Sequence, residues 1–237
     1  MSVVTDEQVE QFRREGHILF SGLIPEEVAR CGEAAMWALL EMDPEDPETW
    51  SEVPDHAVHK PTRHLVQHQN CAAPDILACY TDEVLTALSE LTGKDRGKIH
   101  SPKKVLTQNV FPCDEPWSHS RSHFDGGTNR WKFNDTFPIR YGVHSILYLS
   151  DGEPHGGGTF GWPGTHKTMR GLAVSNPAKY PYLYEVNSDM HLVDIGEPVE
   201  LVAKCGDILF YRNFFVHAGS RNVGARPRFA CRHGWTL

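Results

Sequence analysis

Three residues of this chain have the types and the spacing to hold one metal ion. Among the fourteen histidines, only His123 is followed two positions later by a carboxylate, that of Asp125. On a β-strand, residues two apart point to the same face, so both side chains could bind one ion while Phe124 packs behind them. In a chain with this many histidines, chance supplies about one such pair, so the motif alone does not establish a metal site.

A third ligand is available at His217. It lies in the segment C-G-D-I-L-F-Y-R-N-F-F-V-H-A-G-S-R-N, residues 205–222, where a turn leads into an apolar, strand-like run. Taken alone, His217 is more simply a core or surface histidine. Eleven residues later, Arg228 opens a second strand-like run, R-F-A-C-R-H-G-W, which we expect to pair beside the His217 strand.

Two histidines and one carboxylate on one face of a metal form the facial triad of non-haem Fe(II) oxygenases, which leaves three coordination positions open. An arginine on a neighbouring strand suits this chemistry, because it can bind the far carboxylate of a 2-oxo acid with two hydrogen bonds. The same triad also suits a cupin-like protein that uses zinc or another divalent ion as a lyase, an isomerase or a ligand-binding module. Arg228 discriminates between the two hypotheses, because the second does not require it.

Most of the chain resembles the phytanoyl-CoA dioxygenase family of Fe(II)- and 2-oxoglutarate-dependent oxygenases. The opening E-Q-F-R-R-E-G-H-I-L-F-S-G-L-I-P-E-E is similar to the family's first helix, strand and second helix, and D-E-V-L-T-A-L-S-E-L-T-G to the helix before its barrel. The segment G-G-T-F-G-W-P-G-T-H, residues 157–166, is similar to a P-G-S-H turn after a central strand. His123-Phe124-Asp125 matches the H-x-D pair, His217 the distal histidine, and Asn222 and Arg228 the family's asparagine and its 2-oxoglutarate arginine.

The resemblance implies a ligand set and a reaction. His123, Asp125 and His217 would hold Fe(II), 2-oxoglutarate would chelate the metal, and Arg228 would pair with its far carboxylate. The implied reaction uses O2, converts 2-oxoglutarate to succinate, and hydroxylates or otherwise oxidises an unactivated C–H bond of a small-molecule substrate.

Three features depart from the family's pattern. Ser122 precedes the H-x-D histidine, where members usually carry an aromatic residue. Gly219 stands two positions after the distal histidine, where a small hydroxyl residue is common. A second hydrogen bond to the cosubstrate would therefore come from Ser220 or be missing. Residues 170–194 match nothing recognisable in the family, and we assign them to the substrate side.

Further polar and aromatic residues are candidates for the wall of the cavity. Gln108 lies on a strand that should border the cavity, and we assign it to cosubstrate binding. Arg121 and Arg140 could hold an anionic group of the substrate, although surface ion pairs are the commoner fate of such residues. Trp162 and His233 are the remaining substrate-side candidates, and His233 would line either the site or the core.

Helices should dominate residues 1–100. Thr5 with Gln8 fits a capping box that starts a helix ending at Gly16, and residues 17–20 read as a short strand. Residues 43–70 are expected to be mostly loop. A second helix follows Pro25, with Val28, Cys31, Ala35 and Leu39 on its apolar face, and a third spans Asp82–Leu91, with Val84, Leu85, Leu88 and Leu91 inward.

Residues 101–237 read as short strands separated by turn residues. The expected strands are 105–111, 140–149, 158–160, 198–202, 208–211 and 229–235. Because no helices alternate with most of them, we predict a jelly roll, the cupin-like double-stranded β-helix, supported by the N-terminal helices in a single domain over residues 1–237.

Composition narrows the partners. The formal net charge of −8 argues against broad electrostatic binding to nucleic acid or anionic lipid. No apolar run reaches the about 18 to 20 residues of a membrane span, and the N-terminus lacks the features of a signal peptide. We therefore expect a cytoplasmic enzyme that binds a small molecule.

Overall fold

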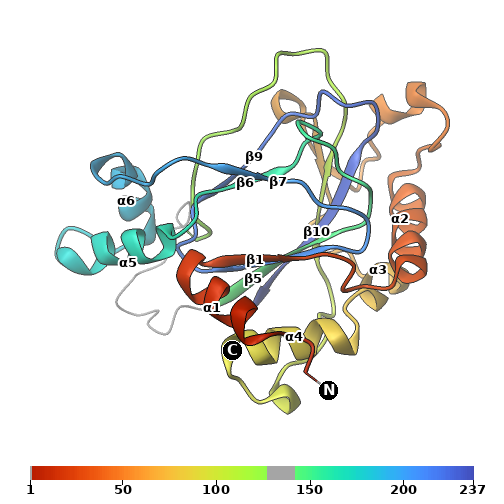
Figure 1. Cartoon of the computed structure of the whole chain (residues 1–237). Coiled ribbons are helices and arrows are strands. Elements are labelled where there is room, and N and C mark those ends of the chain that lie inside the picture. Colours follow the sequence, from red (N-terminus) through yellow and green to blue (C-terminus); the bar gives the residue numbers. More distant parts are fainter. Residues whose placement is uncertain (1, 127–141) are drawn as a thin grey trace.

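Within the described residues, 2–126 and 142–237, the computed structural model contains two antiparallel sheets that lie face to face (Figure 1). The larger sheet has the strand order β1-β8-β5-β10-β4-β3-β2, and the smaller sheet has the order β7-β6-β9. This arrangement confirms the predicted jelly-roll core with N-terminal helices. The strands are β1 (His17–Phe20), β2 (Val58–Lys60), β3 (Leu65–Gln67), β4 (Leu106–Val110), β5 (Val143–Tyr148), β6 (Thr159–Gly161), β7 (Val199–Leu201), β8 (Ile208–Arg212), β9 (His217–Gly219) and β10 (Arg228–Trp235).

Successive side chains of the central strands point to opposite faces of the larger sheet and so belong to two separate apolar layers. In β8, Ile208 and Phe210 pack with the helices outside the larger sheet, whereas Leu209 and Tyr211 face the space between the two sheets. The same period of two puts Ala230 of β10 between the sheets. Side chains at even positions of β10 therefore face the smaller sheet, which is where a site between the sheets must be built.

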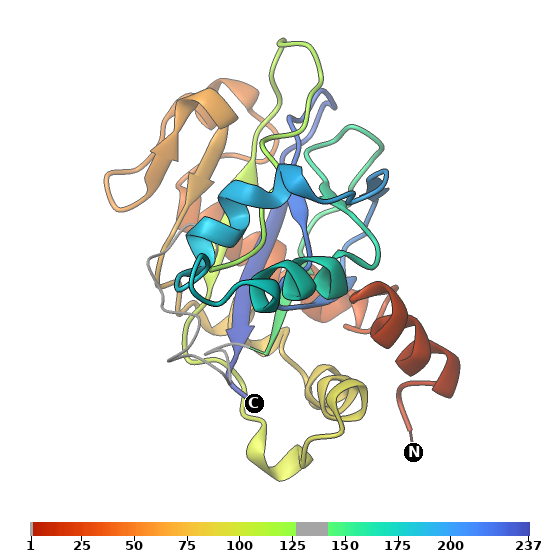
Figure 2. The same ribbon diagram turned by 90° about the vertical axis from the view of Figure 1, so that its left-hand side faces the viewer.

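The N-terminal helices cover the outer face of the larger sheet (Figures 1 and 2). The capping box of Thr5 and Gln8 is confirmed, and Gly16 ends α1 with a left-handed φ of 80°. The helices are α1 (Asp6–Glu15), α2 (Glu26–Leu40), α3 (Pro74–Ala78), α4 (Asp82–Thr92), α5 (Thr165–Ser175) and α6 (Leu183–Ser188), with 3₁₀ turns η1 (Pro47–Ser51), η2 (Pro61–Arg63), η3 (Arg96–Lys98) and η4 (Asp189–Leu192).

The predicted apolar face of α2 holds for Val28, Ala35 and Leu39, which pack against the core, but it is wrong for Cys31 and misses the centre of the face. Cys31 is exposed, and Ala29, Gly32 and Met36 are buried instead. A Cβ at Gly32 would lie 2.9 Å from the Cys79 Sγ, so the glycine permits α2 to approach Cys79 closely. Hydrophobicity alone does not predict a buried glycine at this position. The inward residues of α4, by contrast, are buried as predicted.

One other expectation was incomplete and one was wrong. Residues 43–70 are largely irregular chain and short 3₁₀ turns, but they also contain β2 and β3, which extend the larger sheet through pairing of Leu65 with Val110 on β4. The Arg228 strand does not pair beside the His217 strand: β10 pairs with β4 and β5, whereas β9 pairs with β6 in the other sheet. Arg228 and His217 therefore face each other across the space between the sheets.

Residues 165–192 form a separate apolar layer over the smaller sheet. Met169 and Leu183, from α5 and α6, pack there with Phe124 and Trp162. Figure 2 shows α5 and α6 beside the strands, and the start of α5 lies next to the end of α1, where Gly164 N donates to Glu15 O at 2.8 Å. This layer holds the segment that carries His123 and Asp125 from behind.

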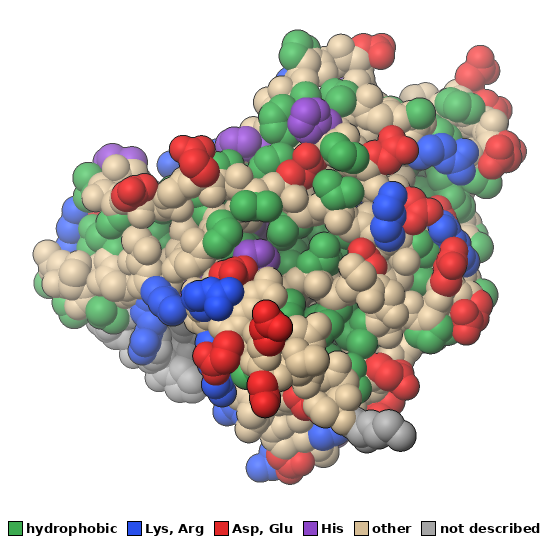
Figure 3. Space-filling view, viewed as in Figure 1, with side chains coloured by type: hydrophobic (Ala, Val, Ile, Leu, Met, Phe, Trp, Pro, Cys, Tyr) green, Lys and Arg blue, Asp and Glu red, His purple; other side chains and the backbone are tan. Residues whose placement is uncertain are grey.

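The outer surface carries mixed charge. Figure 3 shows acidic and basic side chains interspersed on one face. Among the surface ion pairs, Arg30 of α2 pairs with Glu33 at 2.8 Å and with Asp151 at 2.6 Å. No helix in the described part of the chain combines the length and the apolar character required to cross a membrane.

Candidate metal centre

Backbone pairing brings the two histidines of the predicted triad together. His123 N donates to His217 O at 3.0 Å, and His217 N donates to His123 O at 2.8 Å. Residues paired in this way put their side chains on the same face, and the two imidazole centroids are 4.6 Å apart. Asp125, two residues after His123, completes the group, and the three ligand atoms lie within 4.8 Å of one another.

Both imidazoles have their ligating nitrogen selected by the backbone. The Nδ1 atoms of His123 and His217 lie 3.2 Å and 3.0 Å from the carbonyl oxygens of Arg121 and Phe215. Because a carbonyl oxygen only accepts, each Nδ1 carries the proton and each Nε2 keeps its lone pair. The His217 Nε2 lies 3.8 Å from Asp125 Oδ1, so both atoms face the candidate metal position.

Asp125 is held by groups from three strands of the larger sheet. The Tyr211 hydroxyl donates to Oδ2 at 2.7 Å, Arg232 Nη2 lies 2.6 Å from Oδ1, and His144 Nδ1 lies 3.4 Å from Oδ2. Burial alone would raise the pKa of the Asp125 carboxyl, but the positive charge of Arg232, the neighbouring imidazoles and the Tyr211 hydrogen bond outweigh it. The pKa therefore lies well below its usual range.

The histidines remain neutral at neutral pH. Burial lowers the pKa of His217 to about 4 and also lowers the pKa of His123, although Asp125 opposes the shift in both. A neutral imidazole beside an ionised carboxylate is the protonation state that a divalent metal requires of its ligands. The donor set and its protonation therefore fit an Fe(II) ion.

Sequence reasoning missed the residues that hold Asp125. His144 and Tyr211 are directly opposite each other on β5 and β8, and their rings stack at 5.3 Å. Nothing in the sequence distinguishes them from ordinary strand residues. Arg232 did carry a signal: it is four positions after Arg228 on the same strand, so both side chains face the space between the sheets.

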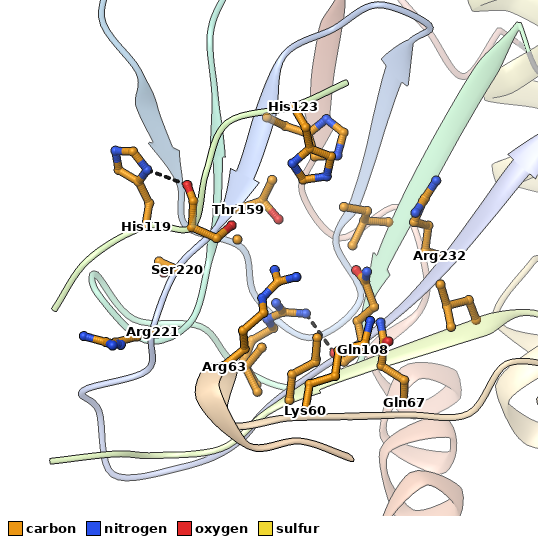
Figure 4. A pocket seen from close by; sticks show the side chains of 18 of the residues that line it. Lys60, Arg63, Gln67, Gln108, His119, His123, Thr159, Ser220, Arg221 and Arg232 are labelled. Atoms are coloured by element: carbon orange, nitrogen blue, oxygen red, sulfur yellow. Dashed lines mark hydrogen bonds between the residues drawn. The ribbon is translucent and has the colours of Figure 1, made fainter. Parts of the chain in front are cut away.

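A cavity of about 520 Å³ opens in front of the two histidines, between the sheets (Figure 4). Its wall contains five cationic residues and, within the described chain, no carboxylate residue. The lining comes from η2, from strands β2, β3, β4, β5, β6, β8, β9 and β10, and from loops, and it includes Lys60, Arg63, Gln67, Gln108, His123, Thr159, Tyr211, His217, Ser220, Arg221, Arg228 and Arg232.

Arg228 is buried in the wall of this cavity. Its Nε donates to Gly157 O at 2.8 Å and its Nη1 to Gln108 O at 2.9 Å, which fixes the guanidinium. No carboxylate among the described residues pairs with it, and burial lowers its pKa. A buried cation without a carboxylate is costly unless a ligand supplies one, so the position suits the far carboxylate of a 2-oxo acid.

The two other cosubstrate candidates, Gln108 and Ser220, also line the cavity. The Ser220 hydroxyl donates to Gly158 O at 3.3 Å. A hydroxyl has a single proton, so in this geometry Ser220 has none left to donate to a carboxylate. Asn222 shapes the turn before β10, because its Nδ2 donates to the carbonyl oxygens of Val110 and Arg226 at 3.2 Å and 2.8 Å.

The substrate-side candidates lie mostly elsewhere. Arg121 is exposed and Trp162 is buried in the α5–α6 layer, so neither lines the cavity. His233 lines a second cavity, which shares Arg232 with the first. Arg140 lies outside the described residues. Strand alternation explains His233, because its odd position directs it away from the cavity that Arg228 faces.

Comparison with known proteins places this geometry in context. The profile of the phytanoyl-CoA dioxygenase (PhyH) family matches residues 3–230. No curated protein sequence matches the chain.

Several solved structures share the fold. The epimerase SnoN from nogalamycin biosynthesis, in complex with Fe3+, alpha ketoglutarate and nogalamycin RO, has a TM-score of 0.65 at 14% identity over 96% of this chain and 81% of its own. EctD from S. alaskensis with bound Fe has a TM-score of 0.63 at 17% identity over 98% of this chain and 76% of its own. EvdO2 from Micromonospora carbonacea var. aurantiaca, complexed with 2-oxoglutarate, has a TM-score of 0.62 at 15% identity over 97% and 89%.

Proposed function

Because the chain belongs to the phytanoyl-CoA dioxygenase family, it is a non-haem iron, 2-oxoglutarate-dependent oxygenase, and we propose that His123, Asp125 and His217 hold its Fe(II). The observation that carries this assignment is the convergence of the three ligand atoms within 4.8 Å, with both Nδ1 atoms bound by backbone carbonyls. Solved structures of the same fold that contain iron or 2-oxoglutarate support it.

When bound at this site, iron and 2-oxoglutarate would supply O2 activation coupled to conversion of the 2-oxo acid to succinate and CO2. The chain supplies the rest. Arg232 and Tyr211 keep Asp125 ionised and oriented, and Arg228 binds the far carboxylate of 2-oxoglutarate. The paired sheets exclude bulk water from the far end of the cavity, where Arg228 is buried. These residues would hold and orient the cosubstrate beside the three ligands.

The substrate is a small molecule. A volume of about 520 Å³ is within the range of ligand pockets, about 300 to 1,000 Å³, and 2-oxoglutarate takes part of it. SnoN and EctD, which share the fold, were crystallised with nogalamycin RO and 5-hydroxyectoine. We propose hydroxylation or a related oxidation of an unactivated C–H bond, with the substrate entering beside His123.

A succinate assay tests this function. The purified protein is supplied anaerobically with Fe(II), then with 2-oxoglutarate, O2 and a panel of small molecules, and succinate is measured against a His217→Ala control. We expect iron-dependent succinate from the wild type only. Turnover of a panel member with zinc in place of iron and without O2 would favour the non-oxidative cupin-like alternative instead.

A further inference from the structure

Among the described residues, two cations of the cavity wall, Lys60 and Arg63, make no ion pair and have no role in the site described above, and Arg63 is the one that contacts the metal-side strand β9. Arg63 ends the 3₁₀ turn η2, and Figure 4 shows its side chain pointing into the middle of the cavity, below His123 and Thr159. Within the described chain, its guanidinium makes no ion pair and no side-chain hydrogen bond. The other arginines of the lining differ: Arg232 pairs with Asp125, and Arg221 pairs with Glu115.

The backbone fixes where Arg63 stands. His64, the next residue, adopts a left-handed conformation with a φ of 46°, and its N donates to Pro61 O at 3.0 Å. Its O accepts from Phe111 N at 2.8 Å, which ties the turn to the end of β4. A non-glycine residue with this φ is unusual, so the turn is held by the sheet rather than by its own preference.

Arg63 shares a cavity wall with both parts of the site. The side chains of Arg63, His123 and Arg228 all line the same cavity. Burial lowers the pKa of Arg228, and the positive charge of Arg63 adds to that shift. Arg63 therefore faces the same space as the arginine assigned to 2-oxoglutarate.

The contact between Arg63 and Gly219 indicates which ligand group Arg63 could bind. A Cβ built at Gly219 has the Arg63 Nη2 as its nearest neighbour, at 3.5 Å. Members of the family commonly carry a hydroxyl residue at this position, and Ser220 has its proton on Gly158 O. The Arg63 guanidinium thus occupies the space above a glycine where a hydrogen-bond donor to the cosubstrate is otherwise missing.

We propose that Arg63 is a second binding residue for the far carboxylate of 2-oxoglutarate, acting beside Arg228 in place of the absent hydroxyl at position 219. Two like charges side by side repel each other in the absence of a ligand, and a carboxylate between them relieves that repulsion. The inference rests on the proposed function. It makes Arg63 specific for the far carboxylate and not for the 2-oxo end.

Calorimetric titration of 2-oxoglutarate into the Mn(II)-loaded protein, with no other substrate present, tests this role. Arg63→Ala should weaken 2-oxoglutarate binding by about ten-fold, the usual size of one charged hydrogen bond that is open to solvent. Binding of 2-oxopentanoate, which lacks the far carboxylate, should not change. Arg221→Ala is the matched control, because it removes a guanidinium of the same lining that donates to Pro116 O at 3.0 Å, and it should leave both affinities unchanged.

A rescue variant distinguishes binding from structural support. Gly219 has space for a side chain once Arg63 is removed, so Arg63→Ala with Gly219→Ser should recover part of the lost 2-oxoglutarate affinity. Unchanged 2-oxoglutarate affinity in Arg63→Ala would overturn the proposal and indicate a role toward an anionic substrate. Equal losses for 2-oxoglutarate and 2-oxopentanoate would overturn it too. Failure of the wild type to bind 2-oxoglutarate at all would instead contradict the proposed function.

Discussion

The two ends of the cavity balance their charges differently. At the metal end, Asp125 is the only carboxylate of the described triad, and it is already paired with Arg232 at 2.6 Å and with Tyr211 at 2.7 Å. At the other end, Arg228 and Arg63 have no carboxylate among the described residues. The first end is internally compensated and preorganised, whereas the second is completed only by an anion. This difference predicts that mutations at the two ends have separable effects.

Loss of Asp125 should have the largest effect. Asp125→Ala removes one metal ligand, so we expect metal affinity to fall by more than about 100-fold, and it also removes the Arg232–Asp125 ion pair. The free energy of unfolding should fall by about 3 kcal/mol. This is the lower end of the range for breaking a buried ion pair, since Arg232 is partly exposed. Metal titration and chemical denaturation measure the two effects. Retained metal affinity would show that the ion binds elsewhere.

Arg228→Ala should affect the opposite end alone. We expect 2-oxoglutarate binding to weaken by roughly 2 to 4 kcal/mol. The charge-assisted hydrogen bonds are lost, and the far carboxylate of 2-oxoglutarate is left buried without a partner. Metal affinity should stay within about two-fold of the wild type. Arg226 is a suitable control, since it is exposed and lies 3.7 Å from Glu45. A larger loss in Arg226→Ala than in Arg228→Ala would contradict the assignment.

Tyr211→Phe should weaken the metal end without removing a ligand. The hydroxyl orients Asp125, and loss of such a hydrogen bond costs about 10- to 100-fold in metal affinity. The affinity for 2-oxoglutarate in the saturated metal complex should be unchanged. Equal losses of metal and 2-oxoglutarate affinity would show that the two ends are coupled.

The smallest effect on metal and 2-oxoglutarate binding is expected from a histidine outside the cavity. Burial, with Arg212 nearby, lowers the pKa of His166 from 6.5 to about 4. Between these values the unfolded chain binds a proton that the folded chain does not, so stability falls as the pH falls from 6.5 to 4. The slope from this group is about 1.4 kcal/mol per pH unit.

His166→Gln should therefore flatten the acid side of the stability profile, measured by urea denaturation between pH 4 and 7. Above pH 6.5 the His166 contribution should not vary. Neither metal nor 2-oxoglutarate affinity should change at neutral pH. An unchanged slope would show that His166 is protonated in the folded chain, contrary to its burial.

The sequence predicted the metal end better than the cosubstrate end. The triad could be predicted because it depends on the types of the ligand residues and on the spacing of two residues between His123 and Asp125. The sheet to which the Arg228 strand belongs could not be predicted, because the alternation of apolar residues identifies a strand but not the strand with which it pairs. Arg63 gave no signal, since it reaches the site through a three-residue turn in a region expected to be loop. Gly32 is a similar case in a helix, because the close packing there depends on the absence of a side chain, which a pattern of apolar residues does not reveal.

The most direct test is a crystal structure of the protein with Fe(II) and 2-oxoglutarate, prepared without O2 and measured at the iron absorption edge. We expect one anomalous peak with ligand atoms of His123, Asp125 and His217 at about 2.0 to 2.2 Å, the usual range for imidazole nitrogen and carboxylate oxygen. The far carboxylate of 2-oxoglutarate should contact Arg228. An iron peak away from His217, or a 2-oxoglutarate molecule directed away from Arg228, would contradict the account.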